Sequence, residues 1–171
     1  MRSILLLILN PKISLTMKLN SSLFITPILL FSLFLFISCG SDHDHGPTPV
    51  GLVLSASGSE IAMQDGTTVT YVDGNSIDLP LNGQLVVNIE FLSEDGDRYY
   101  PDTNDGYSLR VSADNNQILD ITHPVNNNEW TFSLNGLTTG SSNLSFELWH
   151  VGHSDFESRP FQVTVSEITP E

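Results

Sequence analysis

The residues best suited to chemistry lie near the carboxyl end of the chain, where His150, His153 and Asp155 follow one another closely. Imidazole nitrogens and carboxylate oxygens are donors that zinc accepts. A straight strand would send residues three apart to opposite faces, so a turn at Gly152 is required to bring His153 and Asp155 back toward His150. The spacing therefore predicts a divalent transition-metal site, most simply for zinc, with one coordination position left open.

Three other histidines are secondary candidates for metal ligands. His123 ends the alternating run 119–121 just before Pro124, and it is an additional candidate that could take the open position of the predicted site. His43 and His45 alternate with aspartates in residues 42–45, a short polar tract that could capture zinc or copper loosely. The alternative is that each folded histidine closes a core edge and hydrogen-bonds the backbone, while the tract is only a tether.

No arrangement typical of an enzyme occurs in the sequence. It contains no Gly-x-Ser-x-Gly, no phosphate-binding loop and no Cys-x-x-Cys, and Cys39 is its single cysteine. Residues 95–97 and 102–106 carry oxygen donors, but they do not follow the ligand spacing of an EF-hand. We therefore predict a non-enzymatic protein.

Acidic residues dominate the chain after Cys39. All 20 Asp and Glu residues lie there, opposed by Arg98, Arg110 and Arg159 and by no lysine. A surface of this charge repels phosphate backbones and anionic lipid headgroups, which excludes nucleic acid as a partner. It concentrates cations without selecting among them, so selection of zinc would depend on the imidazoles.

Apolar and polar residues alternate with a period of two, which predicts an all-β domain over residues 51–167. The clearest runs are residues 85–91, 107–111, 119–122, 130–134, 144–148 and 161–165. Turn dipeptides such as Asp73-Gly74 and Asn135-Gly136 separate the runs at intervals of roughly 8–12 residues. This pattern is typical of an antiparallel sandwich or barrel.

The second half of the domain resembles bacterial immunoglobulin-like domains. The resemblance rests on residues 118–121, 130–134, 136–146 and 161–165, in which a Gly-Leu turn and a Gly-Ser turn lead into an alternating strand before the final strand. It implies an immunoglobulin-like antiparallel β-sandwich of about seven to nine strands. Such a fold implies no particular activity.

The amino-terminal segment resembles a bacterial lipoprotein signal peptide. An apolar run, residues 23–37, follows Lys18 and leads into Ser38-Cys39-Gly40. The run is shorter than the roughly 20 apolar residues that a spanning helix needs. The resemblance implies that residues 1–38 are a signal peptide, with Met17 as its natural start, and that Cys39 carries lipid. Residues 39–50 would be the lipid anchor and flexible tether; one uncleaved anchor is the alternative.

The resemblance to lipoproteins also implies location and partners. It places the protein in the cell envelope as an outer-membrane lipoprotein, facing the periplasm or the surface and held to the membrane through Cys39. Residues 146–156 are similar to the carboxyl end of small His-rich envelope lipoproteins, which implies metal handling with an envelope transporter or a surface partner. The alternative function is a metal-free adhesion or structural module that contacts glycan or protein, with Tyr99 and Tyr100 exposed and Tyr107 in the core.

We expect the mature protein to begin at a lipid-modified Cys39. Mass spectrometry of the amino-terminal peptide from cell membranes measures this, and Cys39→Ser should abolish both the lipid mass and the membrane attachment. A mature protein with a free amine at another residue, or one that retains residues 1–38, would contradict the interpretation as a lipoprotein.

Overall fold

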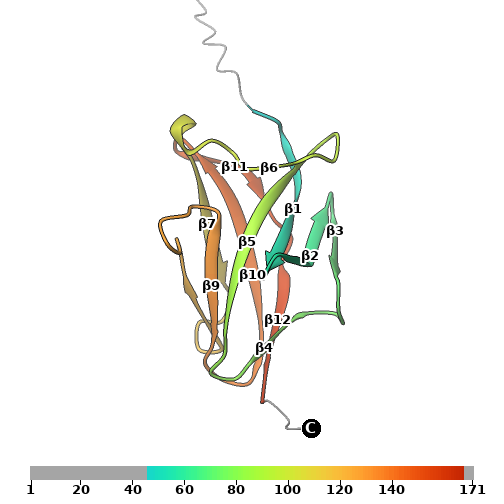
Figure 1. The fold of residues 1–171 in the computed structure, drawn as a ribbon, viewed down its shortest axis with the longest axis vertical. Helices are drawn as coiled ribbons and strands as arrows, with labels where there is room; N and C mark the ends of the chain where they lie inside the picture. The colour runs from blue at the N-terminus through green and yellow to red at the C-terminus, as the bar shows by residue number, and fades with distance from the viewer. Residues whose placement is uncertain (1–45, 168–171) are drawn as a thin grey trace, which may run out of the picture. The chain divides into compact units, whose positions relative to one another are not determined.

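The computed structural model describes residues 46–167, which form two β-sheets around one hydrophobic core (Figure 1). The predicted signal peptide 1–38, the lipid-bearing Cys39 and the tether histidines His43 and His45 lie outside the described residues. Within residues 46–167, no helix has both the length and the apolar character needed to span a bilayer.

The larger sheet has seven strands in the order β3-β2-β1-β5-β9-β8, with β6 paired to β5. These strands are β1 (Pro49–Ala56), β2 (Ser59–Asp65), β3 (Thr68–Tyr71), β5 (Gln84–Ser93), β6 (Arg98–Tyr99), β8 (Leu119–Thr122) and β9 (Thr131–Gly136). The smaller sheet has five strands in the order β11-β10-β12-β4, with β7 paired to β10. They are β4 (Ile77–Pro80), β7 (Tyr107–Ala113), β10 (Gly140–His150), β11 (His153–Glu157) and β12 (Phe161–Ser166). One 3₁₀ turn, η2 (Thr103–Asp105), precedes β7.

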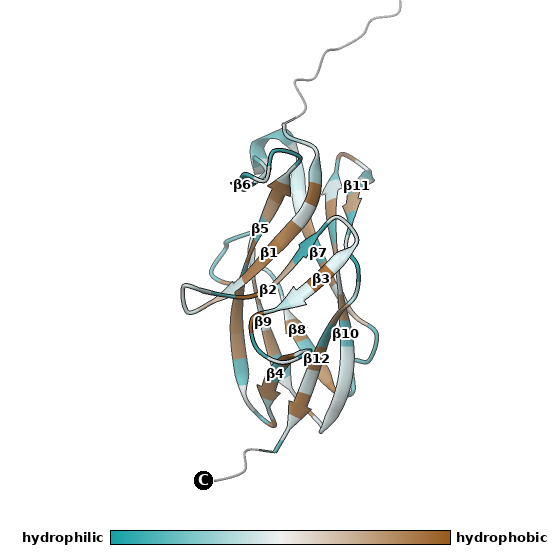
Figure 2. Ribbon diagram, turned by 90° about the vertical axis from the view of Figure 1, so that its right-hand side faces the viewer, coloured by the Kyte–Doolittle hydropathy of each residue, from teal (hydrophilic) through white to brown (hydrophobic). Residues whose placement is uncertain are grey.

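Strand β10 shows how the alternating sequence produces the core. Leu144, Phe146 and Leu148 are at most 1 % exposed, and His150 continues the same inward register at the end of the strand with 8 % exposure. Phe146 meets Phe132 of the opposite sheet with ring centroids 5.3 Å apart. Figure 2 shows the same division along the chain, with apolar residues on the strands and polar residues in many of the connections.

The prediction of an all-β domain with two sheets is confirmed, and two details of it are corrected. The sandwich is not purely antiparallel, because β4 pairs with β12 in parallel, with Ile77 opposite Val163. The strands also exceed the expected seven to nine, since the two sheets hold seven and five. The excess includes β6, whose two residues are too few to show a period of two.

Asp114 joins the end of β7 to β10 through its carboxylate. The main-chain amide of Asn143 and the Ser142 hydroxyl donate to Oδ1 at 2.8 Å each, and the Asn143 side-chain amide donates to Oδ2 at 2.8 Å. These donors, the Asn143 amide foremost, lower the pKa of the Asp114 carboxyl from its usual value. The charged form therefore stabilises the folded state.

We expect Asp114→Asn to destabilise the domain at neutral pH. Because the folded-state pKa is lowered, the contribution of Asp114 is present above its unfolded pKa of about 3.8 and is lost as the pH falls through the lower folded value. Denaturant unfolding of both proteins along a pH series measures the difference, which should shrink on acidification. Asp95→Asn, the same charge change on an exposed turn, is the control. An equal loss of stability in Asp95→Asn would contradict the stabilising role given to the Asp114 carboxylate.

Candidate metal centre

A two-residue hairpin between β10 and β11 brings the two candidate histidines together. Val151 and Gly152 have φ values of +39° and +99°, and positive φ at both central positions is the mark of a type I′ turn. His150 and His153 consequently pair directly across the hairpin. The turn that the sequence required at Gly152 is therefore present, and both imidazoles lie on the same side of it.

Asp155 reaches the same place through a β-bulge. The register between β10 and β11 shifts here, so that Leu148 pairs with Phe156 instead of Asp155. The extra residue in a bulge re-aims a side chain that regular pairing would place elsewhere. Phe156 can then pack edge-on against Phe91, with ring centroids 5.9 Å apart, while Asp155 turns toward the histidines.

The three side chains form a compact group of donors that could hold a metal ion. Asp155 Oδ1 lies 2.7 Å from His153 Nε2, and Asp155 Oδ2 lies 3.2 Å from His150 Nδ1. All three ligand atoms lie within 4.8 Å of one another. Tetrahedral zinc with bonds of about 2.0–2.1 Å needs ligand atoms roughly 3.3 Å apart. The His153 side chain is 65 % exposed, so a rotation of this ring can close the remaining distance.

The hydrogen bond of His150 fixes which nitrogen faces the group. Nε2 lies 3.1 Å from the main-chain oxygen of Asp105, and because a carbonyl only accepts, Nε2 must carry the hydrogen. In the neutral ring the lone pair is then on Nδ1, which lies 3.2 Å from an Asp155 oxygen. A proton or a metal cation between these two atoms would relieve their repulsion. Metal-bound histidines usually donate their other N–H to a carbonyl or carboxylate in this way.

Tyr107 forms a wall of the site. It pairs with His150 across β7 and β10, and the two rings stack with centroids 4.1 Å apart and an interplanar angle of 15°. Burial, the charges of Asp155 and Asp105, and a hydrogen bond with Asp155 all raise the pKa of Tyr107. The phenol therefore stays protonated and can donate to Asp155. Neither Tyr107 nor the Asp105 carbonyl was among the site residues predicted from the sequence.

The structure does not bring His123 into this group. The metal-competent cluster among residues 46–167 consists of His150, His153 and Asp155 alone. His123 follows β8 of the other sheet and donates from Nε2 to the main-chain oxygen of Glu129 at 2.7 Å. It thus takes the backbone-bonded role that was its alternative interpretation. His43 and His45 lie outside the described residues.

Comparison with known proteins adds a distant likeness in fold. No family model matches the chain, and no curated protein matches it. Among solved structures, the chain is similar to three fragments of the S-layer protein SbsC. Domains 5–6 give a TM-score of 0.41 at 12 % identity, covering 57 % of this chain and 43 % of that one. Domains 4 and 5 give a TM-score of 0.39 at 13 % identity, covering 60 % of this chain and 61 % of that one. Domains 4–9 give a TM-score of 0.42 at 11 % identity, covering 72 % of this chain and 23 % of that one.

The chain therefore spans less than two thirds of the length of each SbsC fragment. This β-sandwich distantly resembles those domains, and the likeness is too low to bear on activity, partners or bound metal.

We expect Val151→Asn to stabilise the hairpin. Val151 is β-branched and 74 % exposed, yet it holds a left-handed backbone conformation that asparagine adopts more readily. Thermal unfolding should show a gain of up to about 1 kcal/mol, because Asn-Gly is the preferred type I′ pair. Val72→Asn, at an exposed valine outside the left-handed region, is the control and should give no gain. A loss of stability in Val151→Asn would contradict the assigned turn.

Proposed function

We propose that this protein is a non-enzymatic binding protein of the cell envelope that holds a divalent transition metal, zinc first, at His150, His153 and Asp155. The observation that carries the proposal is the position of His150 Nδ1. Its ring is oriented by the Nε2–H bond to Asp105 and by stacking on Tyr107, so that Nδ1 lies 3.2 Å from the Asp155 carboxylate. Orienting contacts of this kind around a metal ligand usually matter for affinity.

The exposure of the ligands suits a metal that is passed on instead of one that is locked in place. The His150 side chain is 10 % exposed, Asp155 is 23 % exposed and His153 is 65 % exposed, so the group runs from the core edge to solvent. Three protein ligands leave a fourth zinc position for water or for a donor from a partner. An envelope transporter that exchanges the ion is the partner that this open site favours.

The proposal of an envelope location depends on Cys39. Lipid on that residue would hold the protein at the outer membrane, since acyl chains contribute roughly 0.8 kcal/mol for each buried CH₂. The first strand begins at Pro49, shortly after Cys39 in the sequence, so lipid on Cys39 would hold the metal-binding domain close to the membrane surface.

A metal-free surface module remains the second candidate function. The specific observation that favours it is an aromatic- and proline-lined pocket next to the hairpin, to which Tyr99 and Tyr107 contribute. In that function, the histidine–aspartate group would be a hydrogen-bonded edge of the core, and contact with a glycan or a protein would be the main activity.

We expect the protein to bind one zinc ion and His153→Ala to weaken that binding at least tenfold. Isothermal titration calorimetry with zinc measures both, and His153 is the best position because its exposed side chain can be removed without opening the core. His150→Ala is the second variant, checked by circular dichroism because His150 is buried.

His123→Ala, which removes a histidine outside the cluster, is the matched control and should bind zinc as the wild type does. Equal weak heats in the wild type, His153→Ala and His150→Ala would contradict the metal proposal and leave the surface module as the function.

A further inference from the structure

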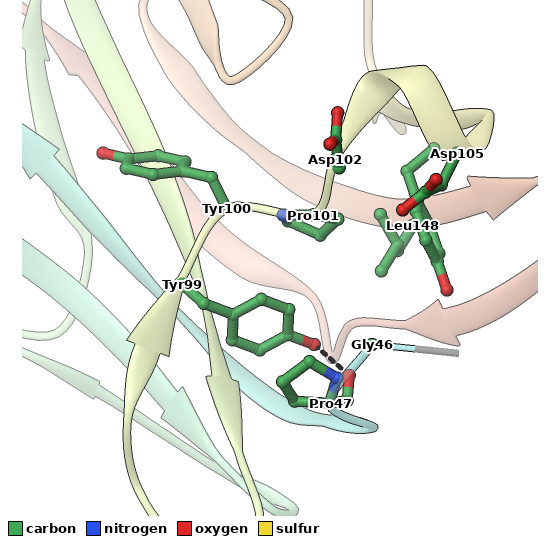
Figure 3. A pocket seen from close by; sticks show the side chains of 9 residues that line it. Gly46, Pro47, Tyr99, Tyr100, Pro101, Asp102, Asp105 and Leu148 are labelled. Atoms are coloured by element: carbon green, nitrogen blue, oxygen red, sulfur yellow. Dashed lines mark hydrogen bonds between the residues drawn. The ribbon is translucent and has the colours of Figure 1, made fainter. Parts of the chain in front are cut away.

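A pocket of about 210 Å³ lies beside the metal centre and shares two residues with it. Figure 3 shows its lining, which comes from segments far apart in the sequence: Pro47 at the start of the described chain, Tyr99 of β6, Pro101, Asp105 of η2 and Leu148 of β10. Tyr107 completes this wall. Asp105 and Tyr107 also contact His150, so an occupant of the pocket would lie next to the metal ligands.

The walls of the pocket are apolar and held in place. Leu148 is 1 % exposed and Pro101 is buried. The Tyr99 hydroxyl donates to the Pro47 carbonyl at 2.6 Å, the dashed line in Figure 3, which fixes Pro47 against the tyrosine. Burial, with smaller effects of Tyr107 and Asp155, raises the pKa of Tyr99 to about 12, so this donor stays protonated. Such walls suit an aliphatic stem.

Two acidic residues also belong to the pocket. Asp102 and Asp105 line it, and both residues are exposed. Asp102 Oδ1 accepts from the main-chain and side-chain nitrogens of Asn104 at 2.9 and 2.8 Å, which orients this carboxylate. An apolar channel with carboxylates at its mouth is complementary to a side chain with a long stem and a positive end.

No arginine or lysine among residues 46–167 lines this pocket, and two of the arginines have other partners. Arg98 pairs with Glu60 at 2.6 Å, and the Arg110 guanidinium lies 3.3 Å from the ring centroid of Trp149. No lysine follows Cys39 in the sequence. Arg98 and Arg110 are thus held by other partners, and we look to another molecule for the complement of this pocket.

We propose that this pocket binds a lysine side chain of a protein partner. The four-carbon stem packs between Tyr99 and Leu148, and the ammonium group meets the carboxylates of Asp102 and Asp105. The tyrosine rings add attraction for a cation that lies over their faces. The domain's excess of acidic residues speeds the encounter with a basic partner. This proposal goes beyond metal binding and holds in the metal-free protein.

The test uses the purified full-length protein in detergent, kept metal-free with a chelator. It is titrated with the peptide acetyl-Gly-Lys-Gly-amide and, separately, with the same peptide carrying norleucine in place of lysine, and backbone amide shifts are followed by NMR. The lysine peptide should shift the amides of Tyr99, Asp105 and Tyr107 and should bind about two- to fivefold more tightly than the norleucine peptide, as expected for an exposed ion pair.

The variant Asp105→Asn tests the contribution of the carboxylate alone, because it retains the main-chain carbonyl that holds His150. It should weaken binding of the lysine peptide about two- to threefold and leave binding of the norleucine peptide unchanged. Asp73→Asn, an equal charge change on an exposed loop, should have no effect.

Equal affinity for the two peptides would overturn the proposal. A loss of lysine-peptide affinity in Asp73→Asn as large as that in Asp105→Asn would also overturn it. So would butylammonium binding as tightly as the lysine peptide, because the pocket would then be a site for free amines. The chelator makes each of these outcomes independent of zinc binding.

Discussion

The structure depends most on the pairing of β10 with its three neighbours. β7 lies along one edge of it, from Ala113 opposite Leu144 to Tyr107 opposite His150. β12 and β11 pair with the beginning and the end of β10 in turn. Because the inward side chains of β10 are fully buried, a slip of one residue would place apolar groups in water, and this fixes the register of the whole sheet.

The candidate metal centre takes its geometry from that register. His150 is the last inward residue of β10, so the same alternation that builds the core places an imidazole at its edge. Tyr107 stacks on this ring because β7 is paired with β10, and His153 faces it because the turn has two residues. The ligands therefore need no loop of their own, because all three lie on strands β10 and β11.

A carboxylate among hydrogen-bond donors is the electrostatic centre of the site. Asp155 lies close to both imidazoles and accepts a hydrogen bond from Tyr107. In the metal-free protein, the Tyr107 hydroxyl and the Nε2–H of His153 offset the charge of Asp155, while the lone pair of His150 Nδ1 faces it. A metal ion that binds there replaces the proton between Asp155 and His153, so the affinity for metal is the difference between two favourable arrangements. The exposed His153 is the ligand best able to move between them.

Much of this arrangement follows from local sequence, and the remainder depends on long-range pairing. The inward register of Leu144, Phe146, Leu148 and His150, and the need for a turn at Gly152, are readable because a period of two and a glycine are local signals. The bulge at Asp155 cannot be predicted from the sequence, because one extra residue does not visibly disturb the alternation in a strand of five residues.

Long-range strand pairing decides which residues surround the metal ligands. It brings Asp105 and Tyr107 to His150 and keeps His123 away from the metal centre. Tyr107 begins a visible inward run, but nothing local shows that it aligns with His150. In the same way, a sequence of alternating residues cannot show that β8, with His123 after it, joins the other sheet from β10. The parallel pairing of β4 with β12 was missed for the same reason.

The most direct test of the metal centre is an NMR measurement of the imidazole nitrogens during zinc titration. We expect His150 to bind zinc through Nδ1 while its Nε2 stays protonated and hydrogen-bonded to the Asp105 carbonyl. We expect His153 to bind zinc through Nε2. The ¹⁵N shifts of those two nitrogens should move to metal-bound values together, and those of His123 should stay unchanged. Coordination through His150 Nε2, or no change at either ring at saturating zinc, would contradict the account.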